Sequence, residues 1–131
     1  MKVVIVGGVA GGASAAARLR RMDEKAEIIL FEKGDYISFA NCGLPYYIGE
    51  VIKEKSDLVV TTPEKMKARF NIDVRTNSEV VNILTDRKEV EVLHHTSGRS
   101  YREKYDKLIL SPGAEPIKPA LPGVEADNVF T

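Results

Sequence analysis

The chain contains a single cysteine, no tryptophan and no excess of either charge. One cysteine cannot form a disulfide within the chain, which excludes a disulfide framework and favours a reducing compartment. Nineteen basic residues balance nineteen acidic ones, which argues against nucleic acid or an anionic membrane as a partner. Long hydrophobic runs are also missing, because glycines from Gly7 onward interrupt the apolar start. We therefore expect a cytoplasmic protein without a membrane or nucleic-acid partner.

The length and composition predict one domain followed by a linker. At 131 residues, of which 44% are hydrophobic, the chain can bury a core of modest size. Residues 1–115 are predicted to form this domain. Residues 116–131 have the composition of a linker, with prolines at 116, 119 and 122 and a glycine at 123.

The first third of the chain has the pattern of a βαβ unit. Lys2–Val6 is a short β-branched run typical of a buried parallel strand. Gly12–Met22 is rich in alanine and predicts a helix, and Glu27–Phe31 predicts a second buried strand that ends at Glu32.

Two further helices are indicated by capping signals. Cys42 to about Gly49 is predicted to form a short helix capped by Asn41. Thr61 or Thr62, followed by Pro63, is predicted to open another helix that ends near Phe70.

The second half of the chain changes to short strands with polar turns. Residues 72–75 predict a third core strand, and an antiparallel meander is predicted at 79–84, 89–94 and 100–104. Residues 106–110 are apolar again and are expected to return to the parallel sheet. The predicted fold class is therefore α/β: a Rossmann-like nucleotide-binding domain with a parallel sheet, helices and a small antiparallel meander.

The glycine-rich turn after the first strand predicts a dinucleotide site. A pyrophosphate needs backbone N–H groups and a helix N-terminus at close approach, and Gly7-Gly8-Val9-Ala10-Gly11-Gly12 lies where such a turn is required. Val9 replaces the usual third-position glycine, so the motif alone is imperfect. Glu32, twenty residues after Gly12, could accept hydrogen bonds from the ribose hydroxyls. The alternative is a glycine-rich turn without a ligand.

Cys42 is the candidate redox residue. It lies in the segment Ser38–Glu50, SFANCGLPYYIGE, at the predicted start of a helix, where free N–H groups favour a thiolate. Without a second cysteine, electrons passing through its sulfur must use a mixed disulfide, a persulfide or a sulfenic acid. The alternative is a buried structural cysteine.

A polar stripe on the first predicted helix is the candidate anion-binding surface. Ser14, Arg18 and Arg21 have the spacing i, i+4, i+7 and share one helix face. Arginine matches phosphate geometry, although a solvated helix face would have the same pattern.

These motifs resemble the amino-terminal part of the coenzyme A (CoA)-disulfide reductases, within the FAD and pyridine nucleotide-disulfide oxidoreductases. The resemblance covers essentially the whole chain and rests on GGVAGGASAAARLRR, FEK, SFANCGLPYYIGE, TPEK and YDKLILSPGA. It implies a homodimeric FAD enzyme that passes electrons from NADH or NADPH through Cys42 to CoA disulfide, a CoA persulfide or polysulfide.

The resemblance also assigns residues to each ligand. It implies cofactor contacts from Gly7, Gly8, Val9, Ala10, Gly11, Gly12, Glu32, Lys33, Val80 and Gly113. It implies substrate contacts from Ser14, Arg18, Arg21, Ser38 and Asn41. We expect no metal site, because His94 and His95 are predicted to point to opposite faces of a strand and no zinc pattern surrounds them. One departure is Phe70, where similar proteins tend to have a lysine that helps bind CoA; Arg69 or Lys67 could take its place.

Two other functions stay open at this point. A flavin NADH oxidase or peroxidase would use Cys42 as a sulfenic acid, and a nucleotide-binding or interaction module would leave it inert. Only one glycine fingerprint is present, whereas a reductase of this type needs a second one for its nicotinamide cofactor. We therefore expect the chain to be a fragment that cannot turn over alone.

Overall fold

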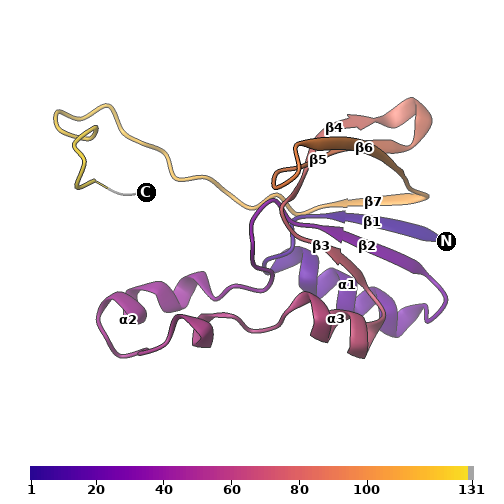
Figure 1. Ribbon diagram of the computed structural model, residues 1–131, viewed down its shortest axis with the longest axis horizontal. Helices are drawn as coiled ribbons and strands as arrows, with labels where there is room; N and C mark the ends of the chain where they lie inside the picture. The colour runs from indigo at the N-terminus through magenta and orange to yellow at the C-terminus, as the bar shows by residue number, and fades with distance from the viewer. Residues whose placement is uncertain (130–131) are drawn as a thin grey trace.

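Four parallel strands form the sheet on which the site is built. The computed structural model describes residues 1–129 (Figure 1). The sheet has the order β3-β2-β1-β7 and consists of β1 (Lys2–Val6), β2 (Glu27–Phe31), β3 (Asp73–Arg75) and β7 (Lys107–Leu110). These elements confirm the predicted α/β class and the return of the chain to the parallel sheet, although Ile72 lies just before β3 rather than in it.

The central strands are apolar because both faces of the sheet are covered. β1 pairs with β2 in register, with Val4 opposite Ile29, and both side chains are at most 1% exposed. Alternate residues such as Ile5 and Leu30 belong to the core on one face, while Val4 and Ile29 belong to the core on the other. Burial on both faces explains the uninterrupted apolar runs in the sequence.

Two helices, α1 (Gly11–Met22) and α3 (Pro63–Phe70), cover one face of the parallel sheet (Figure 1). Ala16 of α1 and Met66 of α3 are buried in the same core cluster as Ile28. α3 begins where predicted, because Thr62 Oγ1 accepts a hydrogen bond from the Lys65 amide at 3.3 Å.

A three-stranded antiparallel sheet covers the opposite face. It consists of β4 (Ser78–Leu84), β5 (Glu89–His94) and β6 (Arg99–Lys104), in that order, close to the predicted meander. Val90 and Val92 of β5 are fully buried and share a cluster with Phe31.

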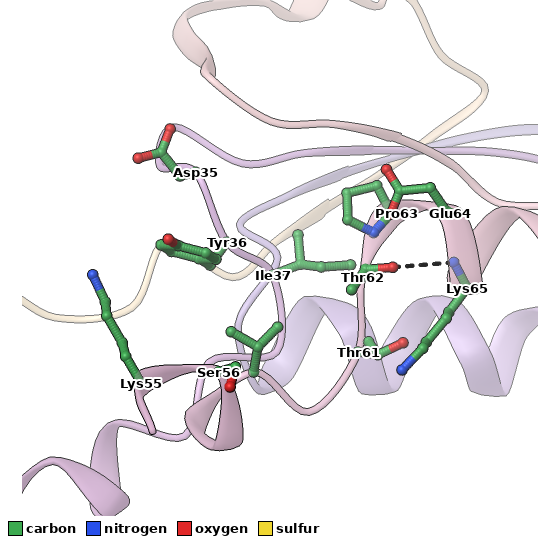
Figure 2. A pocket seen from close by; sticks show the side chains of 11 residues that line it. Asp35, Tyr36, Ile37, Lys55, Ser56, Thr61, Thr62, Pro63, Glu64 and Lys65 are labelled. Atoms are coloured by element: carbon green, nitrogen blue, oxygen red, sulfur yellow. Dashed lines mark hydrogen bonds between the residues drawn. The ribbon is translucent and has the colours of Figure 1, made fainter. Parts of the chain in front are cut away.

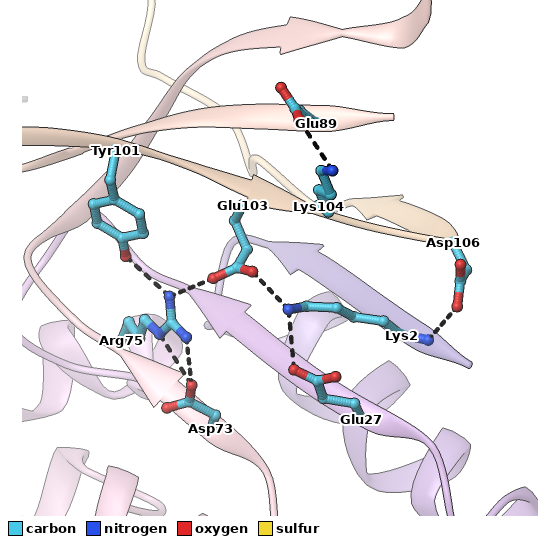
Figure 3. Close-up of polar contacts among 9 residues, drawn as sticks. All are labelled: Lys2, Glu27, Asp73, Arg75, Glu89, Tyr101, Glu103, Lys104 and Asp106. Atoms are coloured by element: carbon cyan, nitrogen blue, oxygen red, sulfur yellow. Dashed lines mark hydrogen bonds and ion pairs between the residues drawn. The ribbon is translucent and has the colours of Figure 1, made fainter. Parts of the chain in front are cut away.

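An ion-pair network joins the two sheets (Figure 3). Glu103 of β6 accepts from Lys2 Nζ at 2.6 Å and from Arg75 at 2.7 Å. Arg75 also pairs with Asp73 at 2.8 Å and donates to the Tyr101 hydroxyl at 3.2 Å. Burial raises the pKa of the Glu103 carboxyl, but the hydrogen bonds from Lys2 and Arg75 outweigh it, so the pKa lies below its ordinary value.

The predicted helix from Cys42 to Gly49 is wrong in its details. The segment forms a 3₁₀ turn, η1 (Asn41–Gly43), followed by the five-residue helix α2 (Leu44–Ile48). Neither element has a side-chain cap, so Asn41 does not cap a helix. Pro45 lies in the first turn of α2, where a missing amide hydrogen is tolerated.

Residues 111–129 contain no helix or strand and run away from the sheets (Figure 1). The linker at 116–131 stays a prediction, and its last two residues lie outside the described part of the chain.

Within residues 1–129, every helix is too short or too polar to cross a membrane.

Candidate functional site

The turn between β1 and α1 leaves no room for side chains at two of its glycines. Gly7 has a φ of +91°, and a Cβ built there would lie 2.0 Å from the Ser111 carbonyl oxygen. A Cβ on Gly12 would lie 1.7 Å from the carbonyl oxygen of Gly7. α1 has no side-chain cap and no acidic residue in its first turn. Its N-terminus can therefore receive an anion from outside the chain.

Glu32 lies at the end of β2, beside this turn. Its side chain is buried, with Oε2 accepting a hydrogen bond from the Gly8 amide at 2.7 Å and Oε1 accepting one from the Gly34 amide at 2.9 Å. These two bonds fix the carboxylate in place. Each oxygen retains a further lone pair, so the carboxylate can also accept hydrogen bonds from ribose hydroxyls.

A hollow of about 160 Å³ opens between the carboxyl ends of the parallel strands and β4. It brings together Gly7, Glu32, Lys33 and Val80, which the resemblance assigned to the cofactor, and Gly113 follows Pro112 at its rim with a φ of +77°. Five other residues of its lining were not predicted from the sequence: Val6, Phe31, Ser78, Glu79 and Pro112. Glu79 is held by His95, whose Nε2 lies 2.9 Å from Glu79 Oε2. The residues present fit the adenosine end of a dinucleotide.

The segment that carries Cys42 starts at the glycine turn. The Ser38 amide donates to the Gly8 carbonyl at 2.9 Å, and the Ser38 carbonyl accepts from the Val60 amide at 3.1 Å. Ser38 has a φ of +48°, which is a strained conformation for a residue with a Cβ. Cys42 is exposed and follows four residues later, at most about 14 Å away along the chain. The exposed thiol is open to an external substrate, and its exposure contradicts the alternative of a buried structural cysteine.

A second groove, of about 560 Å³, runs between α1 and α3. Ser14 and Ser38 contribute to it, which places two of the predicted substrate residues together. Arg18 and Arg21 are exposed on α1, and neither they nor Asn41 belong to the described lining. The full lining is Ala13, Ser14, Ala17, Ser38, Val60, Thr61, Lys65, Met66, Ala68, Arg69 and Phe70.

The structure distinguishes between the two residues proposed to take the place of a lysine at position 70. Arg69 lines the groove, whereas Lys67 lines a separate hollow and donates to Asn71 Oδ1 at 2.9 Å. Lys65, one turn before Arg69, also lines the groove. Sequence reasoning missed Lys65, although the i, i+4 spacing from Arg69 was a usable signal.

Arg20 holds the two walls of this groove together. Its guanidinium donates to four backbone carbonyls, those of Phe70 at 2.7 Å, Asn71 at 3.1 Å, Asp23 at 3.2 Å and Glu24 at 2.6 Å. The first two carbonyls belong to the C-terminal end of α3 and the last two follow α1. The i, i+4, i+7 spacing that predicted Arg18 and Arg21 as site residues does not include Arg20, which lies between them in the sequence.

A further hollow, of about 590 Å³, lies between the loop at Asp35 and Tyr36 and the start of α3 (Figure 2). Lys55 and Tyr36 both line this hollow, and Lys55 Nζ lies 5.4 Å from the centre of the Tyr36 ring. Its charged residues are of both signs, and no predicted site residue contributes to its lining. We assign it no part in the chemistry.

Comparisons with known proteins place the chain among a family and its relatives. A family described as pyridine nucleotide-disulphide oxidoreductase matches residues 1–131. A coenzyme A disulfide reductase of Staphylococcus aureus strain JH9 is 48% identical over 130 residues, which are 99% of this chain and 29% of that protein. The chain thus spans less than a third of that relative's length.

Solved structures give the same fold. A reduced Bacillus anthracis protein named CoADR-RHD is 60% identical with a TM-score of 0.91, over 95% of this chain and 22% of that one. An NAD-dependent persulfide reductase from A. fulgidus is 39% identical with a TM-score of 0.93, over 100% and 24%. A water-forming NADH oxidase from Lactobacillus brevis is 33% identical with a TM-score of 0.88, over 97% and 28%.

Proposed function

Because this chain belongs to the pyridine nucleotide-disulphide oxidoreductase family, we propose that it is the amino-terminal, FAD-binding part of a reductase acting on CoA disulfide or a CoA persulfide. The observation that carries the proposal is the backbone contact between Ser38 and Gly8, because it starts the Cys42 segment at the glycine turn. An exposed thiol on a segment that begins at a nucleotide-type turn is suited to relaying electrons from a bound cofactor to a substrate outside the chain.

The residues that would hold FAD form two groups. The glycine turn, Gly7–Gly12, would bind the pyrophosphate through backbone amides at the start of α1. Glu32, Lys33, Val80 and Gly113 surround or adjoin the hollow of about 160 Å³ and would hold the adenosine. When bound, FAD would supply a carrier that takes a hydride equivalent from NAD(P)H and makes an electron pair available at Cys42.

Cys42 would carry out the sulfur chemistry. Its thiolate attacks one sulfur of CoA disulfide, a new sulfur–sulfur bond forms, and the second CoA leaves as a thiolate that takes a proton from solvent. An electron pair delivered to the Cys42 sulfur then breaks the mixed disulfide and releases the first CoA. Two electrons and two protons thus convert one disulfide into two thiols, and Cys42 returns to its starting state.

The substrate would lie in the groove between α1 and α3. Ser14 and Ser38 line that groove, and Arg18, Arg21 and Asn41 are exposed outside its described lining. A CoA persulfide or polysulfide would be reduced by the same attack, and the similarity to a persulfide reductase supports this wider substrate class.

The whole enzyme would need segments that this chain does not contain. We propose that residues 1–115 form the FAD-binding domain, that 116–131 lead towards an NAD(P)H-binding domain, and that the intact protein is a homodimer. The short span relative to the S. aureus reductase supports this organisation. Light scattering of the intact protein tests the dimer: a monomer mass would reject it.

A substrate panel on the intact protein tests the reaction. NAD(P)H-dependent release of thiol from CoA disulfide or persulfide supports the reductase. The alternative is an NADH oxidase or peroxidase, which the 33% identity to a water-forming oxidase favours. Consumption of oxygen or peroxide without thiol release would establish that alternative and reject the reductase.

A further inference from the structure

The start of β4 forms one wall of the hollow of about 160 Å³ at the carboxyl ends of the parallel strands. Ser78, Glu79 and Val80 line the hollow together with Glu32. A backbone bond fixes this wall relative to β2, because the Ser78 amide donates to the Glu32 carbonyl at 2.9 Å. The position of the wall relative to the carboxylate proposed to bind a ribose is therefore set by the fold before any ligand enters.

The polar groups of this wall offer acceptors rather than donors. The Ser78 side chain is buried, and its Oγ donates its hydrogen to the Thr76 carbonyl at 3.0 Å, so only its lone pairs remain for a ligand. The Glu79 carboxylate can only accept, and the Ser78 amide is already bonded to Glu32. Lys33 is the one side-chain donor left in the described lining. The β4 wall therefore favours a ligand group that donates hydrogen bonds.

His95 holds the Glu79 side chain in place. His95 Nε2 lies 2.9 Å from Glu79 Oε2, and the ring nitrogen donates because a carboxylate has no hydrogen to give. The His95 amide donates to the Asn77 carbonyl at 2.8 Å, and the Asn77 amide donates to the Gly34 carbonyl at 3.0 Å. The histidine is thus tied to the turn that precedes β4. Its contact with Oε2 leaves Glu79 Oε1 for a ligand.

We infer that Ser78 and Glu79 recognise the exocyclic amine of adenine in the bound dinucleotide, with His95 as the positioning residue for Glu79. The amine of adenine carries two hydrogens and has no lone pair to oppose an acceptor. The apolar residues Phe31 and Val80 of the same lining would contact the faces of the base. This inference rests on the proposed function for the identity of the cofactor as FAD, but the acceptor wall itself follows from the hollow.

Calorimetric titration of the flavin-free intact protein tests the inference. The probes are ADP and purine riboside 5′-diphosphate, which is ADP without the exocyclic amine. We expect wild type to bind ADP about tenfold more tightly than the analogue, and Glu79→Ala to reduce this preference to below about threefold. Glu91→Ala is the matched control, because Glu91 lies on the neighbouring strand β5, pairs with Arg102 at 2.7 Å and is absent from the described lining. It should leave the preference unchanged.

Two variants of His95 test its positioning role. His95→Ala should lower the preference for ADP, and His95→Gln, whose side-chain amide can still donate to Glu79, should restore most of it. A merely structural role would weaken the binding of both probes equally and leave the preference unchanged, which would overturn the role of His95.

Three results would overturn recognition of the adenine amine: equal binding of the two probes by wild type, an unchanged preference in Glu79→Ala, or binding of GDP as tight as that of ADP. If the preference depends on Glu79 but the intact protein reduces no disulfide, the adenine site stands and the proposed reductase function fails.

Discussion

The Gly8 amide donates a 2.7 Å hydrogen bond to Glu32 Oε2, so the turn after β1 and the acid after β2 are joined through a single bond. The Glu32 side chain therefore fixes the glycine turn, and its remaining lone pairs would be available to the ribose of the proposed cofactor. Substitution of Glu32 therefore tests the proposed cofactor site directly.

We predict that Glu32→Gln weakens FAD binding by about tenfold, because the amide replaces one acceptor oxygen with a donor facing the ribose or the Gly8 amide. Flavin content after dialysis of the intact protein, measured by absorbance, gives the result. Asp35→Asn removes an exposed carboxylate from the same loop and should leave flavin content unchanged. Full flavin retention in Glu32→Gln would exclude Glu32 from the cofactor site.

Substitution of Gly12 tests whether the turn between β1 and α1 has room for a side chain. A methyl group at this position would lie 1.7 Å from the Gly7 carbonyl oxygen, so Gly12→Ala should lower the free energy of unfolding by about 3 kcal/mol. At Gly11 the nearest atom to a new Cβ is Ser111 Oγ at 3.3 Å, and Gly11→Ala should have a much smaller effect. Urea denaturation of the intact protein compares them, and equal midpoints would contradict the structure.

Substitution of Arg20 tests whether its contacts with the end of α3 stabilise the proposed substrate groove. Arg20→Lys keeps the charge but cannot donate to four carbonyls at once, and it should lower stability by about 1–3 kcal/mol. Arg21→Lys, at an exposed position on the same helix, should change stability by less than about 0.5 kcal/mol. Thermal unfolding of both variants is the measurement. Equal melting temperatures for the two variants would show that the contacts of Arg20 with the carbonyls do not stabilise the protein.

Glu103 predicts an acid-sensitive contact between the sheets. Its pKa in the folded protein lies below the ordinary value of 4.5 despite burial, because Lys2 and Arg75 donate to it. A carboxyl with a lowered folded pKa stabilises the protein above its unfolded pKa, and this stabilisation is lost as the pH falls through the folded value. Glu103→Gln should therefore make the protein less stable than wild type at pH 7. The difference in stability between the two proteins should become smaller below about pH 4. Chemical denaturation at both pH values measures this difference, and a difference that stays the same at the two pH values would contradict this account.

Much of the fold could be predicted because local patterns and packing agree. The structure confirms the strands predicted at β1 and β2 and the tight glycine turn between β1 and α1, and of the two threonines predicted to open α3 it makes Thr62 the cap. The helix around Cys42 could not be placed, because Asn41 resembles a cap and Pro45 resembles a helix start, yet the chain between them forms a 3₁₀ turn. Gly43 of this turn is buried, and a Cβ there would lie 2.5 Å from the Leu58 side chain, a tertiary contact that local sequence signals do not reveal.

The substrate groove shows a different limit. Helical spacing correctly gives Ser14, Arg18 and Arg21 one exposed face of α1. It does not reveal that α3 forms the opposite wall, because that requires the packing of two helices distant in sequence. Arg20 and Lys65 were missed for the same reason. The individual roles of the predicted site residues stay predictions until ligands are bound.

Turnover of the Cys42→Ser variant of the intact protein tests the central claim most directly. With NAD(P)H and CoA disulfide as substrates, we predict that thiol release falls by at least about 1,000-fold, because serine cannot form the mixed disulfide, while flavin content and dimer mass stay at wild-type levels. Thiol release at the wild-type rate would contradict the claim that this one sulfur carries the reaction.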